Sequence, residues 1–134
     1  MKSKIGLVTL GVNNFQKSFK FYNEGLGFKT HNYKIGDDFA VFEMDGTWLS
    51  IYPKEKLAED ITISSDGKGF SGFTLAHNVK TKEEVDKVFN HAIKAGARPI
   101  KRPQDVFWGG YSGYFADPDN YYWEIAYNPF TDLT

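Results

Sequence analysis

The run NYYWEIAYNP at residues 120–129 places one carboxylate among aromatic side chains. Glu124 is flanked directly by Trp123 and Ile125, with tyrosines on either side. A carboxylate in such surroundings can bind a metal ion, hold a cationic or hydroxyl-bearing ligand, or act as a general base. The alternative is that Glu124 is only the polar member of an alternating strand, satisfied by tyrosine hydroxyls and water.

Aromatic residues make up 17% of the chain, and ten of them lie within residues 107–130. This concentration exceeds what a small core requires and predicts an aromatic-lined cavity or interface. Trp108 is followed by Gly109 and Gly110, which places a large ring beside flexible backbone at the entrance of a strand. Trp108 is therefore predicted to be a stacking wall for a planar or hydrophobic ligand. The alternatives are a plug that closes the cavity and a dimer contact.

Other residues with reactive side chains are sparse. The chain has no cysteine, which excludes disulfides, thiolate nucleophiles and cysteine-ligated zinc. Its three histidines, His31, His77 and His91, are far apart in the sequence. A lone histidine is more often structural or exposed than catalytic. No serine or threonine has an evident histidine and aspartate partner for nucleophilic catalysis.

The elements that must position these residues follow one order in the first part of the chain. A β-branched and leucine-rich run at residues 4–12 predicts a strand. Asn13-Asn14 can then cap a helix whose apolar residues recur at helical spacing. Three short strands are predicted to follow, and the joints between them carry hairpin signals. Residues 4–53 therefore predict one βαβββ module.

The same order restarts after a charged, turn-rich segment at residues 54–69, which is predicted to be a linker or lid. A strand pattern leads to Thr81 and Glu84, which form a capping box for a second helix. Three further strand patterns follow. Residues 70–129 therefore predict a second βαβββ module.

The predicted fold class is α+β, with all of residues 1–134 in a single domain. The two βαβββ modules would form cupped mixed sheets around a central cleft, with the helices outside. Because cupped half-barrels leave strand edges that need a partner, we expect a homodimer.

Strand alternation predicts which side chains enter the cleft. In the last strand the more apolar face carries Trp123 and Ile125 and should meet the helix, so Glu124 should lie on the concave side. The same reasoning gives a set of inward-facing residues in the other strands. The predicted ligand contacts are Trp48, Tyr52, Phe73, His77, Tyr114 and Tyr122, and Ser50 and Leu75 are also expected to point inward.

The bulk properties limit the partners. The formal net charge is -1, so nothing favours electrostatic binding of nucleic acid. No run approaches the roughly 20 apolar residues of a membrane helix, and the N-terminus does not resemble a secretory signal. We expect a cytoplasmic protein that binds a small molecule and neither nucleic acid nor a membrane.

These features resemble the vicinal oxygen chelate (VOC) superfamily, which contains glyoxalases, bleomycin-resistance proteins and extradiol dioxygenases. The resemblance spans nearly the whole chain and rests on the doubled βαβββ order and two motifs. The motifs are VNNFQKSFKFYNEGLGF after the first strand and FADPDNYYWEIAYNP near the end. The superfamily usually shows D-P-D-G-x-x-x-E in the second motif, whereas Asn120 stands where glycine is common. Asparagine is the next-best residue for a left-handed turn position, so we expect the turn to be kept.

Catalytic members of that superfamily hold a divalent metal through His, Glu or Gln on the first and fourth strands of each module. The resemblance carries these positions onto Leu7, Ser50, Phe73 and Glu124. Only Glu124 binds metals well, because leucine and phenylalanine have no donor atoms and a serine hydroxyl is a poor ligand. A one-residue slip in register would not restore the set. Because a catalytic transition metal normally needs about three protein ligands, we expect no metal ligand set and no cofactor.

The function that the resemblance implies is a metal-independent protein of the glyoxalase/bleomycin-resistance type. It would bind a small hydrophobic or aromatic ligand in a barrel-like cleft, gripped by Trp108, Trp48 and tyrosines, with Glu124 as polar anchor or catalytic base. Sequestration and proton transfer are both open, so it is undecided whether a reaction is catalysed. The alternatives are a divalent-metal-dependent lyase, isomerase or dioxygenase of the same superfamily, and a purely structural interaction module.

Overall fold

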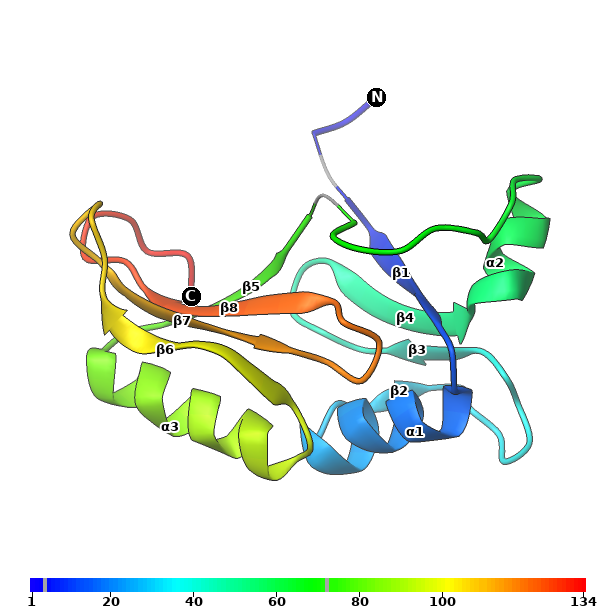
Figure 1. Cartoon of the computed structure of the whole chain (residues 1–134), viewed down its shortest axis with the longest axis horizontal. Coiled ribbons are helices and arrows are strands. Elements are labelled where there is room, and N and C mark those ends of the chain that lie inside the picture. Colours follow the sequence, from blue (N-terminus) through cyan, green and yellow to red (C-terminus); the bar gives the residue numbers. More distant parts are fainter. Residues whose placement is uncertain (4, 72) are drawn as a thin grey trace. The chain divides into compact units, whose positions relative to one another are not determined.

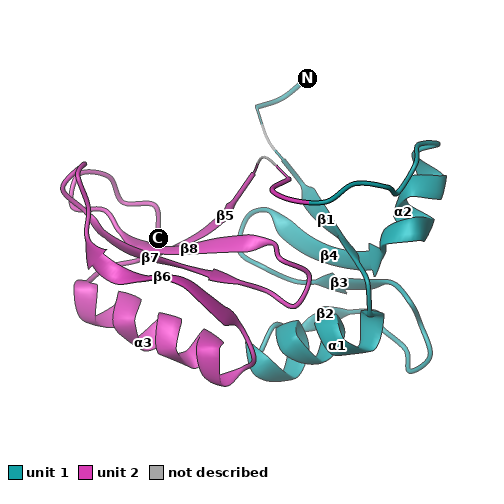
Figure 2. Cartoon of the chain, in the orientation of Figure 1, with its two compact units in different colours: residues 1–68 teal, residues 69–134 magenta. Residues whose placement is uncertain are grey.

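The structure, a computed structural model, describes residues 1–3, 5–71 and 73–134. The chain divides into two compact units, residues 1–68 and residues 69–134 (Figure 2). Within the described residues, the strands form two open four-stranded mixed sheets, one in each unit, and no closed barrel (Figure 1). This arrangement confirms the predicted α+β fold.

Unit 1 builds its sheet in the order β1-β4-β3-β2. Strand β1 runs parallel to β4, and the other pairs are antiparallel. A parallel pair needs a long crossover, and the crossover between β1 and β4 contains the first helix. The strands are β1 (Leu7–Val12), β2 (Thr30–His31), β3 (Ala40–Phe42) and β4 (Trp48–Pro53), and the helices are α1 (Phe15–Lys20), the π-helical turn η1 (Phe21–Gly25) and α2 (Lys54–Asp60).

Unit 2 repeats the pattern in the order β5-β8-β7-β6, with β5 parallel to β8. The long helix α3 lies along one face of this sheet (Figure 1). The elements are β5 (Leu75–Val79), α3 (Lys82–Lys94), β6 (Arg98–Asp105), β7 (Tyr111–Ala116) and β8 (Tyr122–Tyr127).

Both predicted helix starts are confirmed by their capping bonds. The Asn14 side chain accepts a hydrogen bond from the Lys17 amide at 3.0 Å. Thr81 Oγ1 accepts one from the Glu84 amide at 3.2 Å. The Glu84 carboxylate reaches back to the amide of Lys80 at 2.8 Å, one residue earlier than the usual capping box would place it.

The helix-facing core of unit 2 explains why β8 presents Glu124 to the other side. Trp123 and Ile125 are buried, and the Trp123 ring stacks on that of Phe115 with centroids 6.3 Å apart. They meet the buried face of α3, which includes Val85 and Phe89. Because side chains alternate along a strand, Glu124 must point to the opposite face, as predicted.

The turn before β8 fixes the register of that strand. Asp117 is 3% exposed, and its carboxylate accepts hydrogen bonds from the amides of Asp119 and Tyr121, both at 2.8 Å. Asn120 has φ 65°, which confirms the predicted left-handed position. Its side-chain oxygen also accepts a hydrogen bond from Arg98 Nη2 at 2.8 Å. The aspartates and the asparagine of this motif therefore build a turn, and Glu124 is left for another role.

The prediction for residues 54–69 did not include helix α2. Its sequence, KEKLAED, consists mostly of good helix formers, although the mixed charges alone suggested a solvated surface. Ala58 is buried, and Lys56 forms an ion pair with Asp38. No helix among the described residues is long and apolar enough to cross a membrane.

Candidate functional site

Glu124 lies half-buried in the middle of one face of the second sheet. Residues paired across neighbouring strands share a face. Glu124 is paired with Tyr114 on β7 and with Ala76 on β5. We call the surface to which these residues belong the Glu124 face. Its members on β5, β7 and β8 are Ala76, Asn78, Ser112, Tyr114, Ala116, Tyr122, Glu124 and Ala126.

The Glu124 face combines small side chains with two tyrosines. Alanine occupies the paired position on β5 and the next same-face position on β8, so only methyl groups border the carboxylate on these sides. Tyr114 and Tyr122 are the large groups of the face, and both are partly exposed. Two of the predicted ligand contacts, Tyr114 and Tyr122, are therefore brought together with Glu124.

Tyr114 lies directly across from Glu124 on the neighbouring strand. Burial, together with the neighbouring Glu124 carboxylate, raises the pKa of Tyr114. Tyr114 therefore keeps its proton at neutral pH and presents a hydroxyl donor beside the carboxylate. The remaining lone pairs of Glu124 are acceptors for a further donor.

An additional ring reaches the Glu124 face from outside the strands. Phe70 precedes β5, and its ring lies against that of Tyr122 with centroids 5.8 Å apart. Phe70 is 66% exposed. Sequence reasoning missed this residue because it assigned Phe70 only to a strand pattern. The feature of the sequence that could have revealed Phe70 is a bulky aromatic residue immediately after a turn-rich, charged segment.

The parity predicted for β5 is wrong. Leu75 pairs with Trp123 and His77 pairs with Ile125, so both lie on the helix-facing side rather than on the Glu124 face. β5 is an edge strand without a buried residue, and its apolar alternation therefore did not reveal which side faces the core. Burial lowers the pKa of His77, which favours a neutral imidazole.

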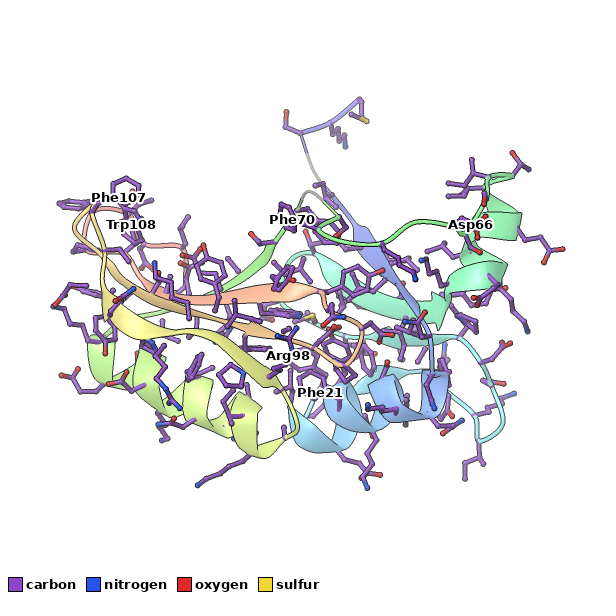
Figure 3. The ribbon with its side chains drawn as sticks, in the orientation of Figure 1. Phe21, Asp66, Phe70, Arg98, Phe107 and Trp108 are labelled. Carbon is purple, nitrogen blue, oxygen red and sulfur yellow. The ribbon has the colours of Figure 1, made fainter. Side chains whose placement is uncertain are left out.

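Phe73 and Trp108 also lie away from Glu124. Phe73 precedes β5, and its ring contacts Tyr121 with centroids 5.7 Å apart. Trp108 lies in the β6–β7 hairpin loop, where Figure 3 shows it next to Phe107 and far from Phe70. Its ring covers Gly110 so closely that a β-carbon there would come within 1.9 Å of it. Ligand binding by these two side chains stays a prediction.

The remaining aromatic candidates belong to unit 1. The Trp48 ring lies 5.1 Å from the imidazole of His31, between centroids. His31 Nδ1 is 2.7 Å from a Glu43 carboxylate oxygen. Tyr52 meets the ring of Phe39 edge-on at 5.5 Å. Trp48 and Tyr52 share a strand face, as predicted, and the contact between His31 and Glu43 beside Trp48 was not foreseen.

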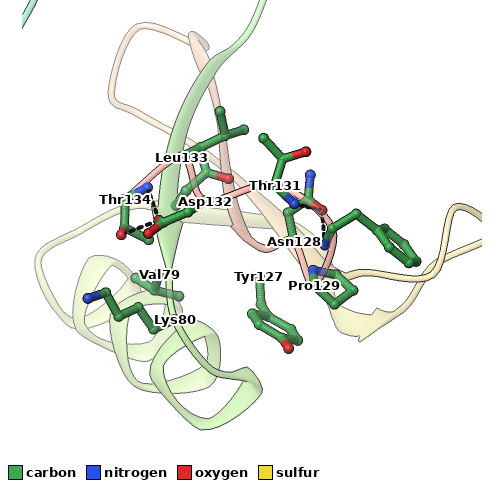
Figure 4. A pocket seen from close by; sticks show the side chains of 11 residues that line it. Val79, Lys80, Tyr127, Asn128, Pro129, Thr131, Asp132, Leu133 and Thr134 are labelled. Carbon is green, nitrogen blue, oxygen red and sulfur yellow. Dashed lines mark hydrogen bonds between the residues drawn. The ribbon is translucent and has the colours of Figure 1, made fainter.

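A pocket of about 230 Å³ lies at the far end of β5 and β8, under the C-terminal residues (Figure 4). Its polar side chains serve local turns. Asn128 Oδ1 accepts bonds from the amides of Phe130 and Thr131. Asp132 Oδ1 accepts bonds from the amide and the hydroxyl of Thr134, which lower the pKa of Asp132. Glu124 is not among the lining residues.

Comparison with known proteins places this geometry in a family. The model of the Glyoxalase/Bleomycin resistance protein/Dioxygenase superfamily matches residues 4–125. The chain belongs to this superfamily. It is 29% identical over 126 residues to the protein YraH of Bacillus subtilis (strain 168), covering 91% of this chain and 96% of YraH.

Solved structures agree with the superfamily assignment. A glyoxalase-related enzyme from Fulvimarina pelagi superposes with a TM-score of 0.88 at 29% identity, covering 99% of this chain and 94% of the enzyme. A superfamily member from Burkholderia phytofirmans PsJN gives a TM-score of 0.82 at 24% identity, covering 93% and 98% of the two chains. At 24% identity, the likeness to the Burkholderia structure shows a shared fold.

The metal positions of the superfamily can now be placed on the strands. Leu7 lies seven residues before the cap Asn14, and Thr74 lies seven before the cap Thr81. The strand pairing agrees. Leu7 pairs with Trp48, which lies two residues before Ser50. Thr74 precedes the Leu75–Trp123 pair, so it corresponds to Tyr122, which lies two residues before Glu124. The position assigned to Phe73 therefore belongs to Thr74. A one-residue slip in the opposite direction would give Gly72, which lies outside the described residues.

The residues at these positions do not fit a transition metal. Leu7 has no donor atom, and the Ser50 hydroxyl is fully buried 2.6 Å from the Thr9 hydroxyl, with which it shares a hydrogen bond. A threonine hydroxyl is as poor a ligand as a serine hydroxyl. In the part of the chain that the structure describes, no three His, Cys, Asp or Glu side chains gather to hold a metal.

Proposed function

We propose that this chain is a metal-independent, small-molecule-binding member of the Glyoxalase/Bleomycin resistance protein/Dioxygenase superfamily, with Glu124 as its polar anchor. The supporting observation is that Glu124 lies opposite Tyr114, whose pKa is raised by burial and by this carboxylate, on a face where the paired residue on β5 is alanine. The Tyr114 hydroxyl would orient the carboxylate, and the small neighbours would allow a ligand to approach it. The ligand would carry a hydrogen-bond donor or a positive charge and an apolar body.

The proposal that no metal takes part is supported by the residue types at the superfamily's ligand positions. A lone carboxylate falls short of the about three protein ligands that a catalytic transition metal normally needs. The buried Ser50 hydroxyl is already bonded to Thr9. Glu124 therefore recognises a donor on the ligand directly.

A second candidate function is proton transfer, which the same pair supports. A carboxylate next to a protonated phenol offers a general base and a general acid within one site. Glu124 would take a proton from a weakly acidic group of the substrate, and Tyr114 would donate to an oxygen on which negative charge develops. The similarity to a glyoxalase-related enzyme agrees with this possibility.

A ligand screen in the presence of a chelator tests the proposal. Small compounds that pair an apolar body with an amine or hydroxyl group should raise the melting temperature of the wild-type protein, because a ligand that binds only the folded state stabilises it. The same compounds should have little effect on the melting temperature of Glu124→Gln. Hits that stabilise both proteins equally, or that appear only after metal is added, would refute the proposed anchor.

A further inference from the structure

Phe70 is an exposed aromatic residue of unit 2 whose position the proposed function leaves unexplained. A ring that is 66% exposed gains little from packing in a core. It nevertheless rests against Tyr122, with the two ring planes tilted by 53°. Phe70 is largely exposed and Tyr122 is partly exposed, so part of this ring pair faces solvent.

Tyr122 connects this ring pair to Glu124. The two residues are separated by one position on β8 and share the Glu124 face. Same-face neighbours on a strand lie about 7 Å apart at a rise of 3.3–3.4 Å per residue. The Glu124 face thus offers an aromatic surface at one point and an anionic acceptor about 7 Å from it.

We propose that Phe70 and Tyr122 form an aromatic clamp that selects ligands with an aryl ring joined by a short alkyl linker to an ammonium group. The inference rests on the proposed function, because it assigns the ammonium to Glu124. The ring would insert against Phe70 and Tyr122, and the ammonium would donate to the carboxylate lone pairs that Tyr114 leaves free.

Charge favours a cation over a neutral donor in this position. A carboxylate attracts an ammonium directly, and the faces of nearby aromatic rings attract it through their quadrupoles. On β5, β7 and β8, Glu124 is the charged member of the Glu124 face, and the other members are alanine, asparagine, serine and tyrosine. The positive charges on this side of the sheet come from the edge strand β6, where Arg98 pairs with Ala116 and Lys101 pairs with Tyr114, two strands away from Glu124. Phe70 therefore acts as a specificity-determining residue that the segment before β5 supplies.

The test compares two probes by NMR chemical-shift titration. 2-Phenylethylamine carries the ring and the ammonium, and ethylamine carries the ammonium alone. Phe70→Ala should weaken 2-phenylethylamine binding about threefold to tenfold and leave ethylamine binding unchanged. The affinity of Phe70→Leu for 2-phenylethylamine should lie between those of the wild type and Phe70→Ala, because leucine keeps apolar area and loses the aromatic face. Phe107→Ala is the matched control, since Phe107 is fully exposed in the β6–β7 hairpin loop.

Glu124→Gln separates failure of the clamp from failure of the anchor. If 2-phenylethylamine binding depends on Glu124 but not on Phe70, the clamp is refuted and the anchor stands. If neither substitution changes binding, both proposals fail. An equal loss for both probes in Phe70→Ala would also overturn the clamp, because it would indicate a general disturbance of the face. Selective loss for the aryl probe supports it.

Discussion

Glu124→Gln should weaken the binding of a cationic ligand about tenfold to a hundredfold, since a hydrogen bond to a charged group contributes about 1.5–3 kcal/mol. The substitution keeps the size of the side chain and its carbonyl oxygen, so the fold and the contact with Tyr114 should persist. What is lost is the negative charge. Calorimetric titration of a hit from the screen measures the change directly.

Two further variants separate the charge from its orientation. Tyr114→Phe removes the hydroxyl beside Glu124 but leaves the charge, so its effect on affinity should be smaller, about twofold to tenfold. Glu83→Gln changes the net charge equally at an exposed position in the first turn of α3. It should leave affinity unchanged. A loss in Glu83→Gln as large as that in Glu124→Gln would mean that net charge, rather than a local contact, controls binding.

Asp117→Ala should lower the free energy of unfolding by about 2–4 kcal/mol, because it deprives two amides of a charged acceptor. The carboxylate is 3% exposed, and water has little access to replace it. A loss of this size is a large part of the 5–15 kcal/mol typical of a domain. Chemical denaturation followed by circular dichroism measures it.

The matched control for this prediction is Asp45→Ala, which removes an exposed aspartate before the left-handed Gly46. It should change the free energy of unfolding by less than about 0.5 kcal/mol. The free energy of unfolding of Asp117→Asn should lie between those of Asp117→Ala and Asp45→Ala, since the asparagine side-chain oxygen can still accept hydrogen bonds from the two amides. If Asp117→Ala were as stable as the control, the turn would not depend on its side chain, and the register of β8 would need another explanation.

The sequence predicted the fold well where two independent signals agreed. The α3 start is an example, because Thr81 and Glu84 gave a capping box exactly where the helical apolar pattern began. Asn120 likewise adopts the left-handed conformation that its place in the turn required. Helix α2 was missed, since its seven residues show mixed charge and little apolar periodicity, and its packing against β1 and β4 was not visible in the pattern.

The orientation of side chains was predictable on central strands and not on edges. On β8, buried Trp123 and Ile125 contrast with Glu124, and the contrast identified the correct face. β5 pairs on one side only, and exposed positions occur on both of its faces, so polarity carried no signal. The position of Phe70 depends on how the segment before β5 approaches the sheet, which no periodic pattern encodes.

The central claim is that Glu124 holds a ligand without a metal ion. It is tested most directly by calorimetric titration of one hit into chelator-treated wild-type protein, repeated after addition of Zn²⁺, Ni²⁺ or Mn²⁺. We predict the same dissociation constant in all four titrations and no stoichiometric binding of the metals themselves. Ligand binding that requires one of these metals, at one ion per chain, would contradict the claim.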